Sequence, residues 1–526
     1  MKQTTPDLQF CKAAFQEKME NEGLSKEVID FFLTLYSKYF QGDSGKICSL
    51  TDISIVPDNS VIHIQSLPKK LTPDMQKKVL RKVAIIKLNG GLGTSMGLDK
   101  VKALLEVKNG VTYFDVIIAQ VQTLQKKTGS LIPLIFMNSF NTDKDTLDFI
   151  RSKHPDFEKL NPTEISFIQN KYPKIDIQTK LPAQHCQKEL EWNPPGHGDI
   201  FSCLFSSGLL DELIDKGYEY AFISNSDNLC ATADPNILAY MLEHKIPFLM
   251  EVARRTEADK KGGHLALLNN EGVLVLREAA QCPEEEKDSF QDVNTWKYFN
   301  TNNIWLDLVA LKEKLRAYNG FLPLDLILNP KRMNMHIKES LGNAEDNKSV
   351  MQIETAMGSA IRIFKGSVAV QIDSLVRFFP TKNISDLLIL WSDACVLKKT
   401  GGLKYLPKNK IVVSLDNNYK YVEDLQFLTN DMKNIPSIKG VMKLIIKGKI
   451  QFRVPTVLKG NVSIINDSNT PLIINKSFLA KIGGENIVNK ILIINRKKTL
   501  NILLTSFNHD GIIAKISDEV KHEKCS

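Results

Sequence analysis

The spacing of hydrophobic residues predicts helices at the start of the chain. In residues 24–40, "LSKEVIDFFLTLYSKYF", apolar and aromatic residues recur every three or four positions, as on one face of a helix. The residues on this face are Val28, Phe31, Phe32, Leu35, Tyr36 and Tyr39. The sequence "GDSGK" breaks the pattern, and a polar stretch containing "LPKKLTPD" follows. We therefore expect an N-terminal helical region over residues 1–80.

From Arg81 the pattern changes to short apolar runs separated by amphipathic segments such as "YFDVIIAQVQTLQKK". The runs are "VAIIKL" (83–88), "LIPLIFM" (131–137), "ISFI" (165–168), "YAFISN" (220–225) and "FLMEV" (248–252). Continuous apolar strands that alternate with helices predict an α/β domain, here residues 81–400, with a largely parallel sheet covered on both faces. In such sheets ligands bind at the carboxyl ends of the strands.

The C-terminal part has a different period. Ile446, Phe452, Leu458 and Ile464 are six residues apart, and Leu444, Ile450, Thr456 and Val462 repeat that spacing. A period of six fits neither a helix nor a hairpin, but it fits the stacked coils of a β-helix. We therefore expect a C-terminal β-helix domain over residues 401–526. Exposed coil edges offer a surface for self-association, although a monomer is equally compatible with the pattern.

Composition and charge narrow the function classes. The chain is 43% hydrophobic and 24% charged, as is usual for globular proteins. Residues 401–526 hold 20 Lys and Arg against 10 Asp and Glu, whereas the rest of the chain is close to balanced. The basic part lacks interleaved aromatic residues, so a solvated lysine-rich surface is favoured over a polyanion site, and no nucleic-acid partner is expected. No signal peptide and no run of about 18 apolar residues is present, so no membrane partner is expected. The cysteines follow no metal-binding spacing and predict reduced thiols and a cytoplasmic location; they are Cys11, Cys48, Cys186, Cys203, Cys230, Cys282, Cys395 and Cys525.

A glycine-rich loop follows the first predicted strand. The sequence "KLNGGLGTSMGLDKVK" (87–102) contains Gly90, Gly91, Gly93 and Gly97. Glycines let the backbone approach a ligand closely, and the N–H groups of such a loop can bind phosphate or a base edge. The spacing matches neither the Walker loop nor the dinucleotide fingerprint. A tight turn made for packing is the alternative, but Lys100 and Lys102 favour an anionic ligand.

Other polar motifs also follow predicted strands. Gln169 ends one strand, where its amide could read a base edge. In "PPGHGD", His197 is open to three readings: a catalytic base, a phosphate donor or a turn residue. In "SNSDNL", Asp227 suits a Mg²⁺ site, with an Asx turn as the alternative. Lys382 precedes a predicted helix, where a plain surface lysine is the alternative.

A further group of polar residues suits the hydroxyl groups of a sugar. The sequences "KGGHL" (261–265) and "FNTNNIW" (299–305) place glycines and asparagines in or beside strands. Glu278 lies at the end of "VLVLREA".

Taken together, these motifs resemble the eukaryotic-type UTP–glucose-1-phosphate uridylyltransferases, also called UDP-glucose pyrophosphorylases. The resemblance covers roughly residues 81–400 and rests on "KLNGGLGTSMG", "MNSFNTD", "PPGHGD", "SNSDNL", "KGG", "FNTNN", "QIETAMGSAI" and "TKNISDLL", in that order. It implies a Rossmann-like nucleotidyltransferase (GT-A-like) central domain and a C-terminal left-handed parallel β-helix. The family usually reads "MGCKGPKS" where this chain reads "MGLDKVKA", but Lys102 is kept.

The resemblance also implies a reaction: UTP and glucose 1-phosphate give UDP-glucose and pyrophosphate, reversibly and with Mg²⁺. It implies catalytic roles for Lys382 and Lys102 and a metal-binding role for Asp227. The substrate-binding residues implied are Leu88, Asn89, Gly90, Gly91, Gln169, Gly196, His197, Asn225, Asp227, Gly263, Glu278, Asn300, Asn302 and Asn303. Of these, Gln169 and Gly196 would contact uracil, and one or more of the three asparagines at 300–303 would contact glucose.

Two other functions remain to be separated from this one. A broad-specificity UDP-sugar or UDP-N-acetylhexosamine pyrophosphorylase is one, although the acetylhexosamine relatives read closer to "GGQGTRLG". A catalytically inactive nucleotide-binding relative is the other. The presence of Lys102, Asp227 and Lys382 argues against that second reading.

Overall fold

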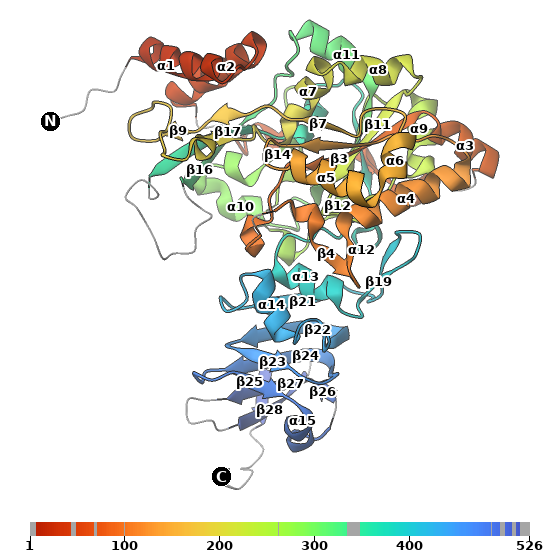
Figure 1. Ribbon diagram of the computed structural model, residues 1–526, viewed down its shortest axis with the longest axis vertical. Coiled ribbons are helices and arrows are strands. Elements are labelled where there is room, and N and C mark those ends of the chain that lie inside the picture. Colours follow the sequence, from red (N-terminus) through yellow and green to blue (C-terminus); the bar gives the residue numbers. More distant parts are fainter. Residues whose placement is uncertain are drawn as a thin grey trace, which may run out of the picture. The chain divides into compact units, whose positions relative to one another are not determined.

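The computed structural model describes residues 7–43, 49–67, 71–98, 100–260, 262–333, 348–484, 486–494, 500–507 and 512–515. The chain forms two compact units (Figure 1). The first comprises residues 1–92, 100–104 and 114–378, and the second comprises residues 93–99, 105–113 and 379–526. The glycine-rich loop is therefore divided between them, because Leu92 belongs to the first unit and Gly93 to the second.

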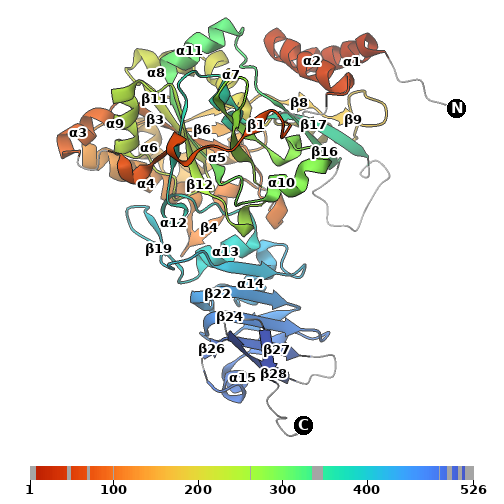
Figure 2. The ribbon, with the colours of Figure 1, turned by 180° about the vertical axis from the view of Figure 1, so that it is seen from behind.

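A mixed β-sheet forms the centre of the first unit (Figures 1 and 2). Along the sheet the strands are β2 (Val61–His63), β18 (Val368–Gln371), β12 (Phe248–Arg254), β15 (Tyr298–Asp307), β11 (Tyr220–Asn225), β3 (Val83–Asn89), β6 (Leu134–Asn138) and β7 (Ser166–Ile168). Neighbouring strands on this path are parallel except that β15 runs antiparallel to β11 and β12. The predicted parallel α/β core is thus confirmed, with one reversed strand inside it.

Smaller strands extend the sheet or form separate ribbons beside it. β1 (Ile53–Ser54) pairs with β13 (His264–Leu268), which pairs with β14 (Val273–Arg277). β8 (Tyr172–Pro173) pairs with β10 (Trp192–Asn193), and β17 (Ser349–Thr355) lies between β16 (Leu326–Arg332) and β9 (Ile175–Asp176). The region before residue 81 therefore contributes strands β1 and β2 as well as helices.

Helices surround the sheet because its strands are apolar on both faces, as the fully buried run from Val83 to Ile86 illustrates. They are α3 (Pro73–Leu80), α4 (Tyr113–Thr128), α5 (Asp143–Lys153), α6 (Pro155–Leu160), α7 (Ile200–Ser206), α8 (Leu209–Asp215), α9 (Pro235–His244), α10 (Lys287–Gln291), α11 (Leu308–Ala317) and α12 (Ser374–Arg377). Within the described residues, no helix is both long and apolar enough to cross a membrane.

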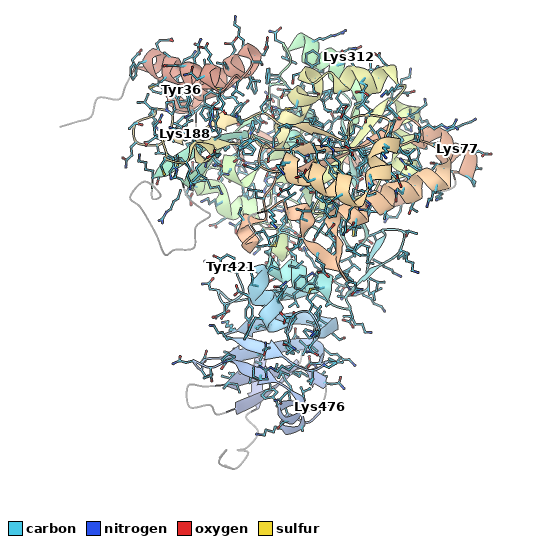
Figure 3. The ribbon with its side chains drawn as sticks, viewed as in Figure 1. Tyr36, Lys77, Lys188, Lys312, Tyr421 and Lys476 are labelled. Carbon is cyan, nitrogen blue, oxygen red and sulfur yellow. The ribbon has the colours of Figure 1, made fainter. Side chains whose placement is uncertain are left out.

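The N-terminal helices α1 (Leu8–Asn21) and α2 (Lys26–Phe40) form a pair with its own hydrophobic cluster. The predicted apolar face of α2 is buried except for the partly buried Phe31, and its Phe32 ring packs against Tyr172 of the β8–β10 ribbon. The hydroxyl group of Tyr36 donates a hydrogen bond to the carbonyl of Lys180 at 2.6 Å. Figure 3 labels Tyr36 and Lys188 on the same side of this unit.

A parallel ladder forms most of the second unit. β21 (Val412–Leu415), β22 (Ser437–Lys447), β24 (Val457–Asn466) and β27 (Lys490–Ile494) pair in parallel, and β23 (Ile450–Phe452) pairs in parallel with β25 (Leu472–Ile474). Leu444 lies opposite Val462, 18 residues on, which is three of the six-residue periods. The side chains at the periodic positions are buried, so the period marks those that point inward. The ladder ends in antiparallel pairs of β27 with β28 (Leu500–Phe507) and of β28 with β29 (Ile512–Lys515).

The remaining elements of the second unit lie around this ladder or precede it in the chain. They are β4 (Glu106–Lys108), β5 (Val111–Thr112), α13 (Ile384–Trp391), β19 (Cys395–Leu397), β20 (Leu403–Tyr405), α14 (Val422–Leu428), α15 (Lys476–Lys481) and β26 (Asn486–Val488). Gly97 rests on the ring of Tyr421, since a Cβ atom at Gly97 would lie 2.5 Å from the Tyr421 Cδ1 atom.

Candidate active site

A cavity of about 550 Å³ opens at the carboxyl ends of β3 and β11 in the first unit. Its wall contains nine of the residues predicted from the sequence, which come from five separate stretches of the chain: Leu88, Gly90, Gly91, Lys102, Gln169, Gly196, His197, Asn225 and Asp227. This is the end of the sheet where ligands bind in open α/β folds. The cavity is therefore the candidate active site.

Gln169 and Gly90 form one part of the wall. A Cβ atom at Gly90 would lie only 2.1 Å from the Gln169 Nε2 atom, so the absence of a side chain at Gly90 makes room for the amide. The backbone N–H of Gln169 donates to the Asn138 carbonyl at 2.8 Å, which extends the β6–β7 pairing. This close approach fixes where the Gln169 amide can present its donor and its acceptor.

Asp199 joins the Gln169 segment to the "PPGHGD" motif. Its carboxylate accepts hydrogen bonds from the Asn170 backbone N–H at 2.7 Å and from the Asn170 Nδ2 atom at 2.8 Å. Gly196 has a φ of +82°, and a Cβ atom there would lie 2.5 Å from the Thr355 carbonyl oxygen. Only glycine fits this backbone position without strain, so the motif places Gly196 and His197 at the cavity beside Gln169.

His197 is held in a defined ring orientation. Its Nδ1 atom accepts a hydrogen bond from the Met357 backbone N–H at 3.0 Å. Because Nδ1 is an acceptor, the neutral ring carries its proton on Nε2. His197 therefore presents an N–H donor, which suits binding a phosphate oxygen.

Lys102 and Asp227 form an ion pair in the cavity wall. The Lys102 Nζ atom lies 2.6 Å from Asp227 Oδ2, and both side chains are more than four-fifths buried. Lys102 is brought back to the glycine loop by the Leu92–Val101 bridge and by its own N–H, which donates to the Gly91 carbonyl at 3.4 Å. The pair places one positive and one negative charge beside the glycine-rich loop.

Asp227 also fits the predicted metal. Its Oδ1 atom is buried and has no hydrogen-bond partner in the described part of the chain. That part contains no cluster of three or more His, Cys, Asp or Glu side chains arranged for a metal. Mg²⁺ in nucleotide sites needs only one or two carboxylates, because phosphates and water complete its coordination. The unpartnered Asp227 oxygen is thus compatible with a magnesium–nucleotide complex.

The residues predicted to bind sugar lie outside the residues that line this cavity. Gly263 and Glu278 are adjacent, since a Cβ atom at Gly263 would lie 2.5 Å from a Glu278 carboxylate oxygen. The Asn300 Nδ2 atom donates to Asn302 Oδ1 at 2.8 Å. Asn303 is fully buried, and its Nδ2 atom donates to Glu251 Oε2 at 3.1 Å. Asn303 is therefore enclosed in the protein, whereas Asn300 and Asn302 are partly exposed and are the accessible candidates for sugar binding.

Two other predicted residues do not line the cavity. Asn89 is 3% exposed, and its side-chain amide donates to Asn138 and Thr146, so only its backbone is available to a ligand. Lys382 belongs to the second unit, where its N–H donates to Asp386 beside the N-terminus of α13. The catalytic role of Lys382 rests on the sequence resemblance and stays a prediction.

The structure adds cavity residues that the sequence did not single out. Lys174 lines the cavity and is 8% exposed, and burial lowers its pKa to about 8. Trp192 and Asn193 lie on the same wall, and the buried Asn193 Oδ1 atom has no partner among the described residues. The β8–β10 pairing brings these segments together. Lys174 follows Gln169 closely in sequence, which is the one signal that could have indicated it.

Sequence comparisons identify one family to which this chain is similar. A model of the family described as UTP--glucose-1-phosphate uridylyltransferase matches residues 29–459. The UTP--glucose-1-phosphate uridylyltransferase of Pyrus pyrifolia is 36% identical over 448 residues, which cover 84% of this chain and 90% of that protein. The enzyme of the same name from Encephalitozoon cuniculi is 35% identical over 472 residues, which cover 88% and 89%.

Solved structures agree with the sequence relatives. The crystal structure of the UDP-glucose phosphorylase of Trypanosoma brucei has a TM-score of 0.82 and 38% identity, and it covers 92% of this chain and all of that one. A point mutant of the UDP-glucose pyrophosphorylase of Leishmania major, solved in complex with UDP-glucose, has a TM-score of 0.81 and 37% identity. That match covers 92% of this chain and 99% of the other.

Proposed function

This chain belongs to the family of UTP–glucose-1-phosphate uridylyltransferases, and we infer that it joins UTP and glucose 1-phosphate into UDP-glucose and releases pyrophosphate. The observation that carries this inference is the meeting of the Gln169 amide and the Lys102–Asp227 pair at one cavity beside the glycine-rich loop. An amide that can read a base edge and a charged pair that can bind phosphates are what a nucleoside triphosphate requires.

The reaction depends on stabilising negative charge more than on transferring protons. A phosphate oxygen of glucose 1-phosphate forms a bond to the α-phosphorus of UTP, and the bond from that phosphorus to the bridging oxygen breaks. Pyrophosphate departs with the electron pair. The attacking oxygen is already anionic at neutral pH, so no general base is required. Catalysis then depends on positioning two polyanions and on stabilising charge at the α-phosphate.

The residues of the cavity have separate roles in this scheme. We propose that Gln169 and the backbone at Gly196 bind uracil, and that Leu88 to Gly91 hold the nucleotide through backbone groups. His197, with its proton on Nε2, acts as a positioning donor to the sugar phosphate, beside Asn225. Lys102 contacts the triphosphate.

We propose Mg²⁺ as the cofactor, with Asp227 as its protein ligand through the unpartnered Oδ1 atom. The metal would supply a positive charge shared between phosphate oxygens. Asp227 would hold the metal, and Lys102 and Lys382 would add two ammonium groups. Gly263, Glu278 and Asn300 or Asn302 would bind the glucose hydroxyls.

The C-terminal ladder supports two further proposals. The 18-residue offset between paired strands supports a left-handed parallel β-helix as the fold of this region. Its last coils offer a surface for self-association, so we propose a homo-oligomer, which light scattering of the purified protein would test.

The free cysteines among the described residues support a cytoplasmic location.

The test of the main proposal is pyrophosphate release from UTP and Mg²⁺ by the purified protein. Glucose 1-phosphate, galactose 1-phosphate and N-acetylglucosamine 1-phosphate are supplied in parallel. We expect release with glucose 1-phosphate. Comparable release with several sugars would indicate a broad-specificity enzyme, and none with any sugar would indicate an inactive nucleotide-binding relative.

A further inference from the structure

Lys87, on the strand that leads into the glycine-rich loop, has its ammonium group inside the protein. The side chain is on β3 and is 2% exposed. Its Nζ atom donates to the Ser224 hydroxyl and to the Ala231 carbonyl, both at 2.8 Å. Within the described residues Lys87 makes no ion pair, so a hydroxyl and a carbonyl are its hydrogen-bonding partners there.

The two partners of Lys87 flank the segment that carries Asp227. Ser224 lies opposite Lys87 in the parallel β3–β11 pairing, three residues before Asp227. Ala231 lies four residues after Asp227. One ammonium group thus holds both ends of the segment 224–231 against the strand that leads into the glycine-rich loop.

A second contact ties the same segment to the loop. The Ser226 backbone N–H donates to the Leu88 carbonyl at 3.0 Å, and the Ser226 hydroxyl donates to Asn89 Oδ1 at 3.3 Å. Asp227 therefore follows a residue that is bonded to the last two residues of β3, directly before the glycine-rich loop. The position of its carboxylate depends on the Lys87 and Ser226 contacts together.

Stability alone does not account for a lysine at this position. Burial, with the nearby charge of Arg377, lowers the pKa of Lys87 to about 7. A buried ammonium without a carboxylate partner is costly, and an apolar residue of similar volume is often neutral or stabilising in its place. An apolar side chain could not, however, donate hydrogen bonds to the Ser224 hydroxyl and the Ala231 carbonyl.

We propose that Lys87 is a positioning residue for uridylyl transfer, which fixes the Asp227 carboxylate relative to the nucleotide loop by bonding both ends of the segment 224–231. This proposal rests on the proposed function, because it assigns Asp227 to the metal–triphosphate complex. It goes beyond the residues that the family resemblance implies, since Lys87 does not line the cavity.

The test compares Lys87→Met with the wild-type protein in two measurements. Calorimetry gives the affinity for UTP with and without Mg²⁺, and thermal unfolding gives the melting temperature. We expect Lys87→Met to keep or raise the melting temperature. Its affinity for UTP in the presence of Mg²⁺ should fall roughly 10- to 100-fold, as for a displaced site group. UTP binding without Mg²⁺ should change little.

Two further variants sharpen the test. Ser224→Ala removes one hydrogen-bond acceptor of Lys87 and keeps the lysine, so the affinity for UTP in the presence of Mg²⁺ should also fall, by a smaller factor. If Lys87→Met does not fold, Ser224→Ala takes its place in the test. Lys108→Met is the matched control, because the part-buried Lys108 ammonium group likewise donates to two protein groups, the backbone carbonyls of Ser392 and Cys395 in the second unit. It should leave UTP binding unchanged, whatever its effect on the melting temperature.

Wild-type affinity for Mg²⁺–UTP in a folded Lys87→Met protein, or in Ser224→Ala where Lys87→Met does not fold, would overturn the proposal. So would a loss of melting temperature in Lys87→Met with no change in binding. These outcomes differ from a failure of the proposed function, in which the wild-type protein would bind Mg²⁺–UTP but release no pyrophosphate with any sugar phosphate.

Discussion

The ammonium group of Lys102 and the carboxylate of Asp227 are paired in the cavity, 2.6 Å apart. Each of these groups is predicted to bind a ligand, Lys102 a phosphate and Asp227 a metal ion, but here they bind each other. A triphosphate offers Lys102 a second anionic partner, and a cation offers Asp227 a second positive one. The pair therefore keeps two mostly buried charges compensated until substrate provides better partners.

Asp227→Asn should reduce kcat/KM by about 100-fold or more, comparable to the loss of a donor in an oxyanion hole. The amide keeps the size of the side chain but removes the charge that a Mg²⁺ ligand needs. Pyrophosphate release at several Mg²⁺ concentrations measures this effect, and excess Mg²⁺ should not restore the rate. Asp211→Asn is the matched control, because Asp211 pairs with Lys312 at 2.7 Å on the surface, where Lys312 is labelled in Figure 3. Activity of Asp227→Asn equal to that of Asp211→Asn would contradict the assignment.

Lys382→Ala should lose activity at least about 100-fold, since it removes a proposed ammonium contact to the transferred phosphate. The fold should survive, because Lys382 contributes its backbone N–H, and not its ammonium group, to the bond with Asp386. Lys420→Ala is a close control, because the Lys420 N–H donates in the same way to Asp424 in the first turn of α14. Steady-state kinetics and melting temperatures of both variants are compared. Near-normal turnover in Lys382→Ala would show that the lysine is an ordinary surface residue.

Gly90→Ala should raise KM for UTP roughly tenfold and leave KM for glucose 1-phosphate nearly unchanged. The added methyl group would meet the Gln169 Nε2 atom at 2.1 Å, so the amide must move away from its place in the cavity. A double-mutant cycle with Gln169→Ala tests this cause. Gly90→Ala should have little further effect once the Gln169 side chain is gone, whereas additive effects would mean that the methyl group acts elsewhere.

His264 should make the protein sensitive to acid. Its side chain is fully buried and stacked on Trp296, and burial, together with the charges of Arg255 and Arg277, lowers its pKa to about 3. An unfolded histidine has a pKa of about 6.5. Between these values the unfolded chain binds more protons than the folded one, so stability falls as the pH falls below about 6.5. At about pH 4.5 the loss from this group is about 2–3 kcal/mol.

Thermal unfolding of wild type and His264→Phe at neutral pH and at about pH 4.5 measures this contribution. The wild-type melting temperature should drop further than that of the variant on acidification, because phenylalanine keeps the stacking but binds no proton. Equal drops would mean that other groups govern the acid response.

The sequence predicted those features that depend on local pattern. The apolar run at 83–88 became most of β3 (Val83–Asn89), the run at 165–168 contains β7, and the run at 220–225 is β11. Gln169 and Asp227 were singled out because they follow predicted strands, whereas the binding roles of Leu88, Gly196 and Asn225 came from the family resemblance. Long-range pairing was not accessible in the same way: the reversed strand β15 and the β8–β10 ribbon, which brings Trp192 to the cavity, are set by contacts distant in sequence.

The asparagines of β15 illustrate a local limit. Side chains alternate along a regular strand, which would group Asn300 with Asn302. Asn302, however, has a φ of +58°, and the pairing with β12 shifts register between Glu251 and Val252. The sequence pattern does not reveal this irregularity of the strand, so it could not show that the Asn303 side chain turns inward to Glu251. Lys87, inside an apolar run, likewise gave no sign of its two polar partners.

The division of the glycine-rich loop between the two units limits how this chain can be divided into fragments. The chain leaves the first unit after Leu92, returns by Lys100, leaves again after Leu104 and returns at Phe114. No single cut separates the units, and Gly97 has its supporting ring, Tyr421, more than three hundred residues away in sequence. A gene fragment that ends near residue 378 would encode a nucleotide loop without its support. The C-terminal unit is therefore not an exchangeable module, and chimaeras with a relative need to replace the early loop segments along with it.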